Sequence, residues 1–554
     1  MSSSGLETRY DGPDTVQPEP GAGSSPVWRR GVILAAAALA VALLFGLCLR
    51  HAWAARTGSD GAVMALQARD MLGGNLLLRG WTLPDMTFYT IELPELMLAE
   101  LARGLNTGDV HLVEALNYTL LVVLAALLAK GRTGGREGIL RAAVAAGILL
   151  APGPGVAGTV AFANPDHLGT QLLVLAAWLI ADRSRPCWQV PVAVALLLGW
   201  AQVSDGMTLI EGILPLLAVS AMRAYRGRHG PLRALWYDLS LGAAAVAAGL
   251  AANLALSLIR QAGGFRAYPL TYSFAYVDAL SSHVWLTAET VLALFGADFS
   301  GQRLSPQAPV GVWTALIHLA GVALACWALA VAARRFTGHD RVVQLMAVAV
   351  AVVLGLFTTL GGFDVGGGAH DILPVLPFGA VLAGRLLAAR LIRRDLVLAL
   401  VVPLACSAAL FASVAVQPAR PADGYQRVAS WLRARHFRYG LADYWTASAV
   451  ALDAGGRVQV VPVMSKSFRI DVAPWNSEAS WYDPGRHRAT FMVLPAVWPG
   501  CPAGTAGAWE TAARNTFGRP ERTFAAGAFQ VLVWHQNLLR APLTPLPPAR
   551  PGAC

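Results

Sequence analysis

The sequence predicts a polytopic α-helical membrane protein with a small α/β domain at its C-terminal end. Three observations predict this fold class. Of the 554 residues, 55% are apolar and only 14% are charged, which excludes an ordinary soluble enzyme. Apolar runs close to the ~20 residues that cross a bilayer recur as far as residue 417. Beyond residue 417 the sequence turns polar, and its periodicity alternates between helix and strand.

Eleven apolar segments are predicted as membrane spans, and the first lacks a small-residue cleavage site and is therefore predicted to be a retained anchor. The spans are residues 31–50, 111–129, 138–152, 168–181, 187–203, 208–222, 234–259, 310–332, 341–360, 370–387 and 395–417. The predicted domains are a disordered N-terminus at 1–27, a transmembrane domain at 28–417 with long loops at 51–110 and 260–309, an α/β domain at 418–541 and a Pro-rich tail at 542–554.

The formal charge of +10 comes mainly from arginines in every second link between the spans. Arginines placed in this way orient a membrane protein, because basic links stay in the cytoplasm. We therefore predict a multi-pass plasma-membrane protein that does not bind nucleic acid. Its N-terminus is cytoplasmic, and its two long loops and C-terminal domain are extracytoplasmic.

The C-terminal domain is predicted to contain helices at 425–436 and 505–515 and strands at 457–463, 490–494 and 528–534. Two of its stretches, YGLADYWTASAV and WNSEASWYDP, are rich in Trp and Tyr. Such stretches are common where sugars stack, and equally common in a core or at a lipid interface. Cys501 and Cys554 could pair if the domain is extracytoplasmic.

The first long loop carries the leading candidate for catalysis. Asp60 precedes a short segment, 62–72, whose apolar residues favour a helix lying on the lipid surface. A carboxylate at the mouth of a membrane cavity can act as a general base. The alternative is that Asp60 caps the N-terminus of this helix.

Other candidates lie in the same set of links. Asp166, in ANPDHLGTQLL, could assist the base or hold a divalent cation together with Asp60, or could be a helix cap. His167 could bind the substrate or its phosphate, or could be a solvated, interfacial histidine, which is the expectation from the residues alone. His370 and Asp371, after three glycines, could contact a phosphate or could belong to a glycine hinge. Arg69 and Arg266 could pair with a phosphate, or could reach toward lipid headgroups.

The stretches SDGAVMALQARDMLGGN, NPDH and HDILPVLP give the chain a resemblance to the GT-C superfamily of polyprenyl-phosphate-sugar-dependent membrane glycosyltransferases. Protein O-mannosyltransferases and aminoarabinose transferases belong to this superfamily. The resemblance implies that Asp60 is the general base, that Asp166 is a second acid and that His370 lies near the donor phosphate. The chain departs from the mannosyltransferases in having Gly61 where they carry a second acid.

The resemblance implies an inverting transfer of a sugar from a polyprenyl-phosphate donor to an extracytoplasmic glycan, lipid or protein. The reaction requires no cofactor, and a divalent metal is compatible with it. A P-loop and a G-x-S-x-G motif are both absent from the sequence. Two alternatives stay open: a transporter or flippase of a lipid-linked substrate, and a non-catalytic membrane protein whose C-terminal domain binds glycan or protein.

Overall fold

The structure is a computed structural model. It describes residues 27–152, 156–163, 167–268, 273–299, 309–361, 368–393, 397–417, 423–498 and 501–544. The chain divides into two compact units, Met1–Leu44 and Phe45–Cys554. Helix α1 (Val27–Ala54) begins in the first unit and ends in the second.

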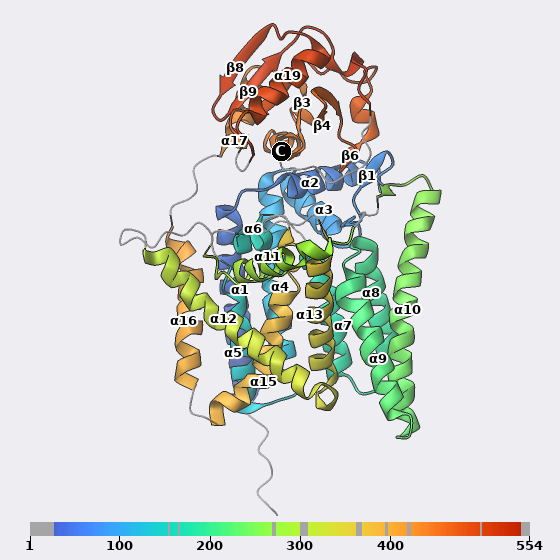
Figure 1. Ribbon diagram of the computed structural model, residues 1–554, viewed down its shortest axis with the longest axis vertical. Helices are drawn as coiled ribbons and strands as arrows, with labels where there is room; N and C mark the ends of the chain where they lie inside the picture. The colour runs from blue at the N-terminus through green and yellow to red at the C-terminus, as the bar shows by residue number, and fades with distance from the viewer. Residues whose placement is uncertain are drawn as a thin grey trace, which may run out of the picture. The chain divides into compact units, whose positions relative to one another are not determined.

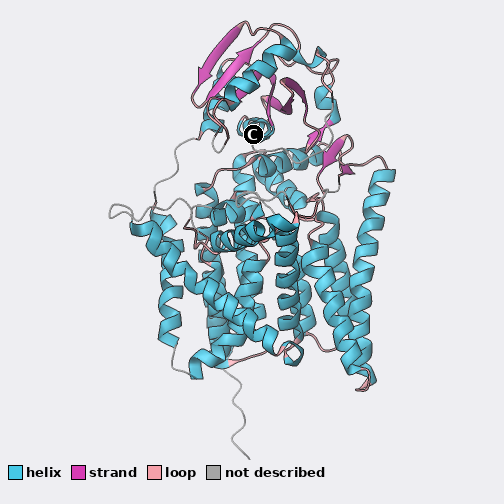
Figure 2. Cartoon of the chain, viewed as in Figure 1, coloured by secondary structure: helices cyan, strands magenta, loops and turns pink. Residues whose placement is uncertain are grey.

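Most of the described chain is helical, and the strands gather in the C-terminal domain and in a small sheet beside it (Figure 2). The helices between residues 107 and 412 are α4 (Thr107–Lys130), α5 (Gly135–Leu149), α6 (Val156–Phe162), α7 (Leu168–Arg183), α8 (Gln189–Ser204), a π-helical turn (Leu209–Ile213), α9 (Leu214–Gly227), α10 (Leu232–Gln261), α11 (Leu280–Leu294), α12 (Pro309–Arg334), α13 (Arg341–Thr359), α15 (Val375–Arg393) and α16 (Val397–Ala412).

Each of the eleven predicted spans coincides with one of these helices or with α1. Among the described residues, six helices are long and apolar enough to cross a membrane, which confirms a multi-pass helical protein. The tenth span begins later than predicted, because residues 371–374 form turns ahead of Val375. It also ends later, at Arg393.

Arg385 lies inside α15, and its side chain is buried. Its guanidinium contacts the carboxylates of Asp182 and Asp340 at 2.6 and 2.8 Å, and its Nε donates to the Leu128 carbonyl at 2.7 Å. A buried arginine is tolerated here because partners from three other segments neutralise its charge and satisfy its donors.

The C-terminal domain is a six-stranded mixed sheet with the strand order β5-β4-β3-β7-β9-β8. Strand β3 runs parallel to both of its neighbours, and the other pairs are antiparallel. The elements are α17 (Gly424–Ala434), β3 (Tyr439–Asp443), α18 (Tyr444–Asp453), β4 (Gln459–Lys466), β5 (Arg469–Val472), β7 (Phe491–Pro495), α19 (Thr505–Phe517), β8 (Arg522–Ala526) and β9 (Phe529–Val533). This confirms the predicted α/β domain, to which the structure adds β3, α18, β5 and β8.

Between the long helices and this domain lie α2 (Ser59–Leu72), α3 (Glu92–Arg103) and a small sheet (Figure 1). The sheet joins three distant segments. Its central strand β1 (Trp81–Leu83) pairs with β2 (Arg266–Ala267) on one side and with β6 (Ser477–Glu478) of the C-terminal domain on the other.

The expectation that the helix after Asp60 lies on the lipid surface is wrong. Helix α2 is buried along nearly its whole length, from Ser59 to Ala68 apart from Asp60. Its side chains share one apolar core with residues of α3, α4 and α18. Helix α18 of the C-terminal domain packs against α2, which explains why α2 is apolar or small on more than one side.

Candidate functional site

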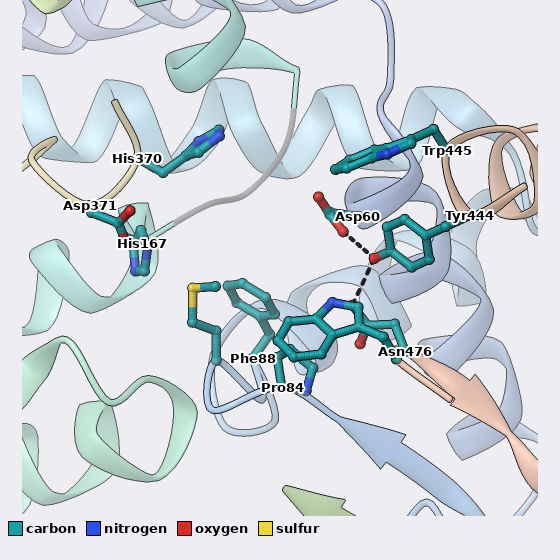
Figure 3. Close-up of a pocket in the computed structure, with 11 residues that line it drawn as sticks. Asp60, Pro84, Phe88, His167, His370, Asp371, Tyr444, Trp445 and Asn476 are labelled. Carbon is teal, nitrogen blue, oxygen red and sulfur yellow. Dashed lines mark hydrogen bonds between the residues drawn. The ribbon is translucent and has the colours of Figure 1, made fainter. Parts of the chain in front are cut away.

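A pocket lies where α2, the first loop and the C-terminal domain meet. Figure 3 shows two groups of polar side chains facing each other across it. Asp60, Tyr444 and Asn476 form one group, and His167, His370 and Asp371 form the other. The remaining lining residues are apolar or aromatic: Pro84, Met86, Phe88, Trp445 and Trp475.

Asp60 is held by the C-terminal domain. Strand β3 ends at Asp443, whose carboxylate accepts from the Trp445 amide at 3.0 Å and caps α18. Tyr444 is therefore the first residue of α18, and its hydroxyl donates to Asp60 Oδ1. Asp60 does not have the capping role considered for it. Gly58 occupies the N-cap position of α2, and Asp60 is the second residue of the helix.

Three further hydrogen bonds hold the Tyr444 side of the pocket in place. Asn476 Nδ2 donates to the Tyr444 hydroxyl at 3.1 Å, and Gln67 Nε2 donates to Asn476 Oδ1 at 3.4 Å. Ser59 Oγ donates to the Tyr444 carbonyl at 2.5 Å. The Tyr444 hydroxyl donates a hydrogen bond to the Asp60 carboxylate and accepts one from Asn476. A hydrogen bond donated to a carboxylate favours its ionised form.

His167 is buried, which corrects the expectation of a solvated, interfacial histidine. Its Nδ1 lies 2.6 Å from Asp205 Oδ2, and the same oxygen accepts from Thr170 Oγ1 at 2.9 Å. Asp205 ends α8 and also accepts from the Met207 amide at 2.8 Å. Burial alone would raise the pKa of Asp205, but the charge and hydrogen bond of His167 and the other two donors bring it below its usual value.

A second carboxyl, that of Asp85, interacts with the His167–Asp205 pair. Burial raises the pKa of Asp85 to about 7; the negative charges of Asp205 and Asp371 add to the rise, and His167 opposes it. The first loop reaches this region through a bridge between Met86 and Asp205. Asp85 is therefore a carboxyl that gains or loses a proton near neutral pH at the edge of the pocket.

The backbone is strained at three residues that line the pocket. Phe88, His167 and Asn476 have φ values of 54°, 57° and 50°, in the left-handed region that L-residues seldom occupy. The Phe88 conformation is held by its amide, which donates to the Ser204 carbonyl at 2.9 Å. Strain of this kind tends to gather at functional sites, where the surrounding contacts maintain it.

The structure brings together four of the seven predicted site residues. Asp60, His167, His370 and Asp371 line the same pocket. Asp166 lies outside the described residues. Arg69 is exposed near the end of α2 and lines a different cleft, and Arg266 is exposed on strand β2.

The sequence reasoning did not assign the four residues that the C-terminal domain contributes: Tyr444, Trp445, Trp475 and Asn476. A signal for them existed, because both aromatic-rich stretches contain two of them. That signal could not be separated from a core or an interface without knowing that α18 packs on α2.

The described residues contain no group of three or more His, Cys, Asp or Glu side chains placed to hold a metal ion. The predicted metal site needed Asp166 beside Asp60, and Asp166 is not among the residues that the structure covers. A metal at this position therefore stays a prediction.

The bundle of long apolar helices, the polar pocket and the α/β domain together define the fold, and solved structures of ArnT share this fold. The chain is similar to ArnT from Cupriavidus metallidurans in the apo state, with a TM-score of 0.51 and 14% identity over 92% of this chain and 98% of that one. It is also similar to ArnT from Cupriavidus metallidurans bound to undecaprenyl phosphate, with a TM-score of 0.52, 16% identity and the same coverage. No protein-family model and no curated protein matches the sequence.

Proposed function

We propose that the protein is an inverting membrane glycosyltransferase that moves a sugar from a polyprenyl-phosphate donor to an extracytoplasmic acceptor. The observation that carries this proposal is a carboxylate, Asp60, held at a pocket whose opposite wall carries two histidines. The shared fold with a protein whose structure holds undecaprenyl phosphate supports the class of donor. The aromatic lining supports a sugar as the group that is bound.

Asp60 is the general base of the proposed reaction. The acceptor hydroxyl oxygen forms a bond to the anomeric carbon, and its proton passes to the Asp60 carboxylate. The bond between the anomeric carbon and the phosphate oxygen breaks, and its electron pair leaves with the polyprenyl phosphate. Attack from the face opposite the phosphate inverts the configuration at that carbon.

His167 and His370 stabilise the leaving phosphate in this proposal. Charge accumulates on the phosphate oxygens as the glycosidic bond breaks, and donors fixed in advance lower the energy of that state. His167 is fixed, because Asp205 and the left-handed backbone hold its ring in place. Asp205 also favours the charged imidazolium, which is the better partner for an anion.

The proposed orientation places the pocket and the C-terminal domain outside the cytoplasm. The arginine-rich links support this sidedness. Cys501 is disulfide-bonded, and disulfides are typical of oxidising compartments. Its predicted partner, Cys554, lies outside the described residues.

Purified protein in lipid nanodiscs, incubated with labelled polyprenyl-phosphate sugars and a cell-envelope extract as acceptor, tests the proposal. We expect wild-type protein to transfer label, and Asp60→Asn protein to lose at least about a hundredfold in rate, the lower range for removal of a general base. Asp483→Asn is the control, since Asp483 is a half-exposed carboxylate of the same chain that pairs with Arg486 away from the pocket.

Full transfer by the Asp60→Asn protein would remove the assigned role of Asp60. A wild-type protein that carries the labelled lipid across a bilayer without transferring its sugar would replace the transferase proposal with the transporter alternative. A wild-type protein that does neither would leave the binding-protein alternative.

A further inference from the structure

A second and larger cleft opens at the other end of α2. The end of α2, strand β1 and the C-terminal domain form most of it. Its polar and aromatic lining residues are Arg69, Asp70, Trp81, Gln459, Glu478 and Trp481. Gly104 and Gly455, both at positive φ, lie at its border, where an added Cβ would meet no atom within 4 Å.

Three segments line both the catalytic pocket and this cleft. Helix α2 carries Asp60 in its first turn and Asp70 in its last, ten residues along the chain, which corresponds to about 15 Å along a helix axis. The loop that begins at Trp81 reaches the pocket at Pro84, and the C-terminal segment runs from Trp475 in the pocket to Trp481 in the cleft. The pocket and the cleft therefore lie at opposite ends of α2, and near neighbours in the 81–86 segment and in the 475–481 segment line both.

Two carboxylates in the cleft are held in fixed directions. Asp70 Oδ2 accepts from Trp81 Nε1 at 2.7 Å and from Asn75 Nδ2 at 2.6 Å. Glu478 accepts from the amide of Ser480 at 3.0 Å and from its hydroxyl, and it occupies the space where a side chain at residue 80 would begin. Fixed carboxylates are acceptors suited to neighbouring hydroxyl groups, and they repel a phosphate or another anion.

The aromatic side chains of the cleft are rigid as well. The Trp81 and Trp481 rings meet edge to face with their centroids 4.9 Å apart, and the Trp481 carbonyl accepts from the Tyr439 hydroxyl at 2.7 Å. Trp81 is buried and Trp481 is partly buried, and both line the cleft. An aromatic ring at the wall of a cleft, beside fixed polar groups, suits the apolar face and hydroxyl edge of a sugar.

We propose that this cleft binds the part of an acceptor saccharide that lies beyond the sugar receiving the new bond. The proposal rests on the proposed function for the position of the reacting hydroxyl, and it narrows the acceptor from glycan, lipid or protein to a chain of sugars. It commits to a neutral saccharide, since the cleft combines one arginine with two carboxylates and offers no cluster of cations for a phosphate.

The test measures binding, so that it does not depend on catalysis. Full-length protein in nanodiscs is titrated by calorimetry with linear mannan, arabinan and glucan oligosaccharides, from disaccharides to hexasaccharides. We expect at least one series to bind more tightly as its chain lengthens. Glu478→Gln should weaken the longest member of that series about tenfold, as expected for the loss of a hydrogen bond worth about 1.4 kcal/mol, and should leave its disaccharide unchanged.

Glu510→Gln is the matched control, because Glu510 is a carboxylate of the same domain that pairs with Arg514 outside the cleft. Trp481→Phe is a second cleft variant; it keeps an aromatic ring against Trp81 and should weaken the same long oligosaccharides. The proposal is overturned if none of the saccharides binds the wild-type protein, or if both cleft variants bind them as the control does. Saccharide binding through the cleft by a protein that transfers no sugar would instead contradict the proposed function alone.

Discussion

Replacing Tyr444 by Phe tests whether the C-terminal domain helps to set the state of the catalytic base. The change removes one oxygen atom and leaves the ring between Asp60 and Trp445 in place. A hydrogen bond to a charged group contributes about 1.5–3 kcal/mol. Because the lost bond favoured the ionised carboxylate, the acid limb of the pH profile of kcat/KM should move to higher pH by about one to two units.

The assay is the rate of sugar transfer in nanodiscs between pH 4 and pH 9. Tyr482→Phe is the control, since the Tyr482 hydroxyl donates to the Pro462 carbonyl at 2.5 Å inside the same domain and does not line the pocket. Other titratable groups line the pocket too, and their limbs should stay in place in both variants: His167, His370 and Asp371. An acid limb in the Tyr444→Phe protein that coincides with that of the wild type and of the control would refute this reasoning.

Three further predictions concern stability, measured by thermal unfolding in detergent. Asp205→Asn should lower the free energy of unfolding by about 3–5 kcal/mol at neutral pH, because it leaves His167 buried without its charged partner. Since the pKa of Asp205 is lowered in the folded protein, this contribution is complete above the ordinary Asp pKa and disappears as the pH falls through the lowered pKa. An equal loss at every pH would contradict the assignment. Asp85→Asn should raise Tm by a few degrees at pH 8 and change it little at pH 4. The raised pKa of about 7 means that the buried carboxylate is charged, and destabilises the fold, only at the higher pH. A larger gain in Tm at pH 4 would show that burial does not cause the raised pKa. Arg385→Met should cost about 3–5 kcal/mol by removing the closest cationic partner of Asp182, which keeps only the longer contact with Arg183. Adding Asp182→Asn should restore part of the loss, whereas purely additive effects would argue against the pairing of Arg385 with Asp182.

Part of this architecture could be predicted from sequence, because it depends on local patterns. An apolar run needs only its own length to indicate a span, and each of the eleven runs contains a helix. The position of Asp60 just after the first span was enough to select it, and it lines the pocket.

The rest depends on pairs that are distant in sequence. Tyr444 lies 384 residues from Asp60, and Asp205 lies 38 residues from His167. His167 was expected to be solvated because its neighbours in sequence give it no partner, and only the fold brings Asp205 to its ring. Helix α2 was expected at the lipid surface for the same reason, since the sequence does not show which segment covers it.

The small sheet has a consequence for any motion of the C-terminal domain. Strand β6 is joined to β1 by two residue pairs, Trp81 with Glu478 and Thr82 with Ser477, and β1 is joined in turn to β2. A displacement of the domain therefore either separates those two pairs or pulls the first loop along with it. The C-terminal domain is therefore more than an accessory module. A protein without residues 423–544 would lose Tyr444 and Asn476 from beside Asp60, and its pocket would be incomplete.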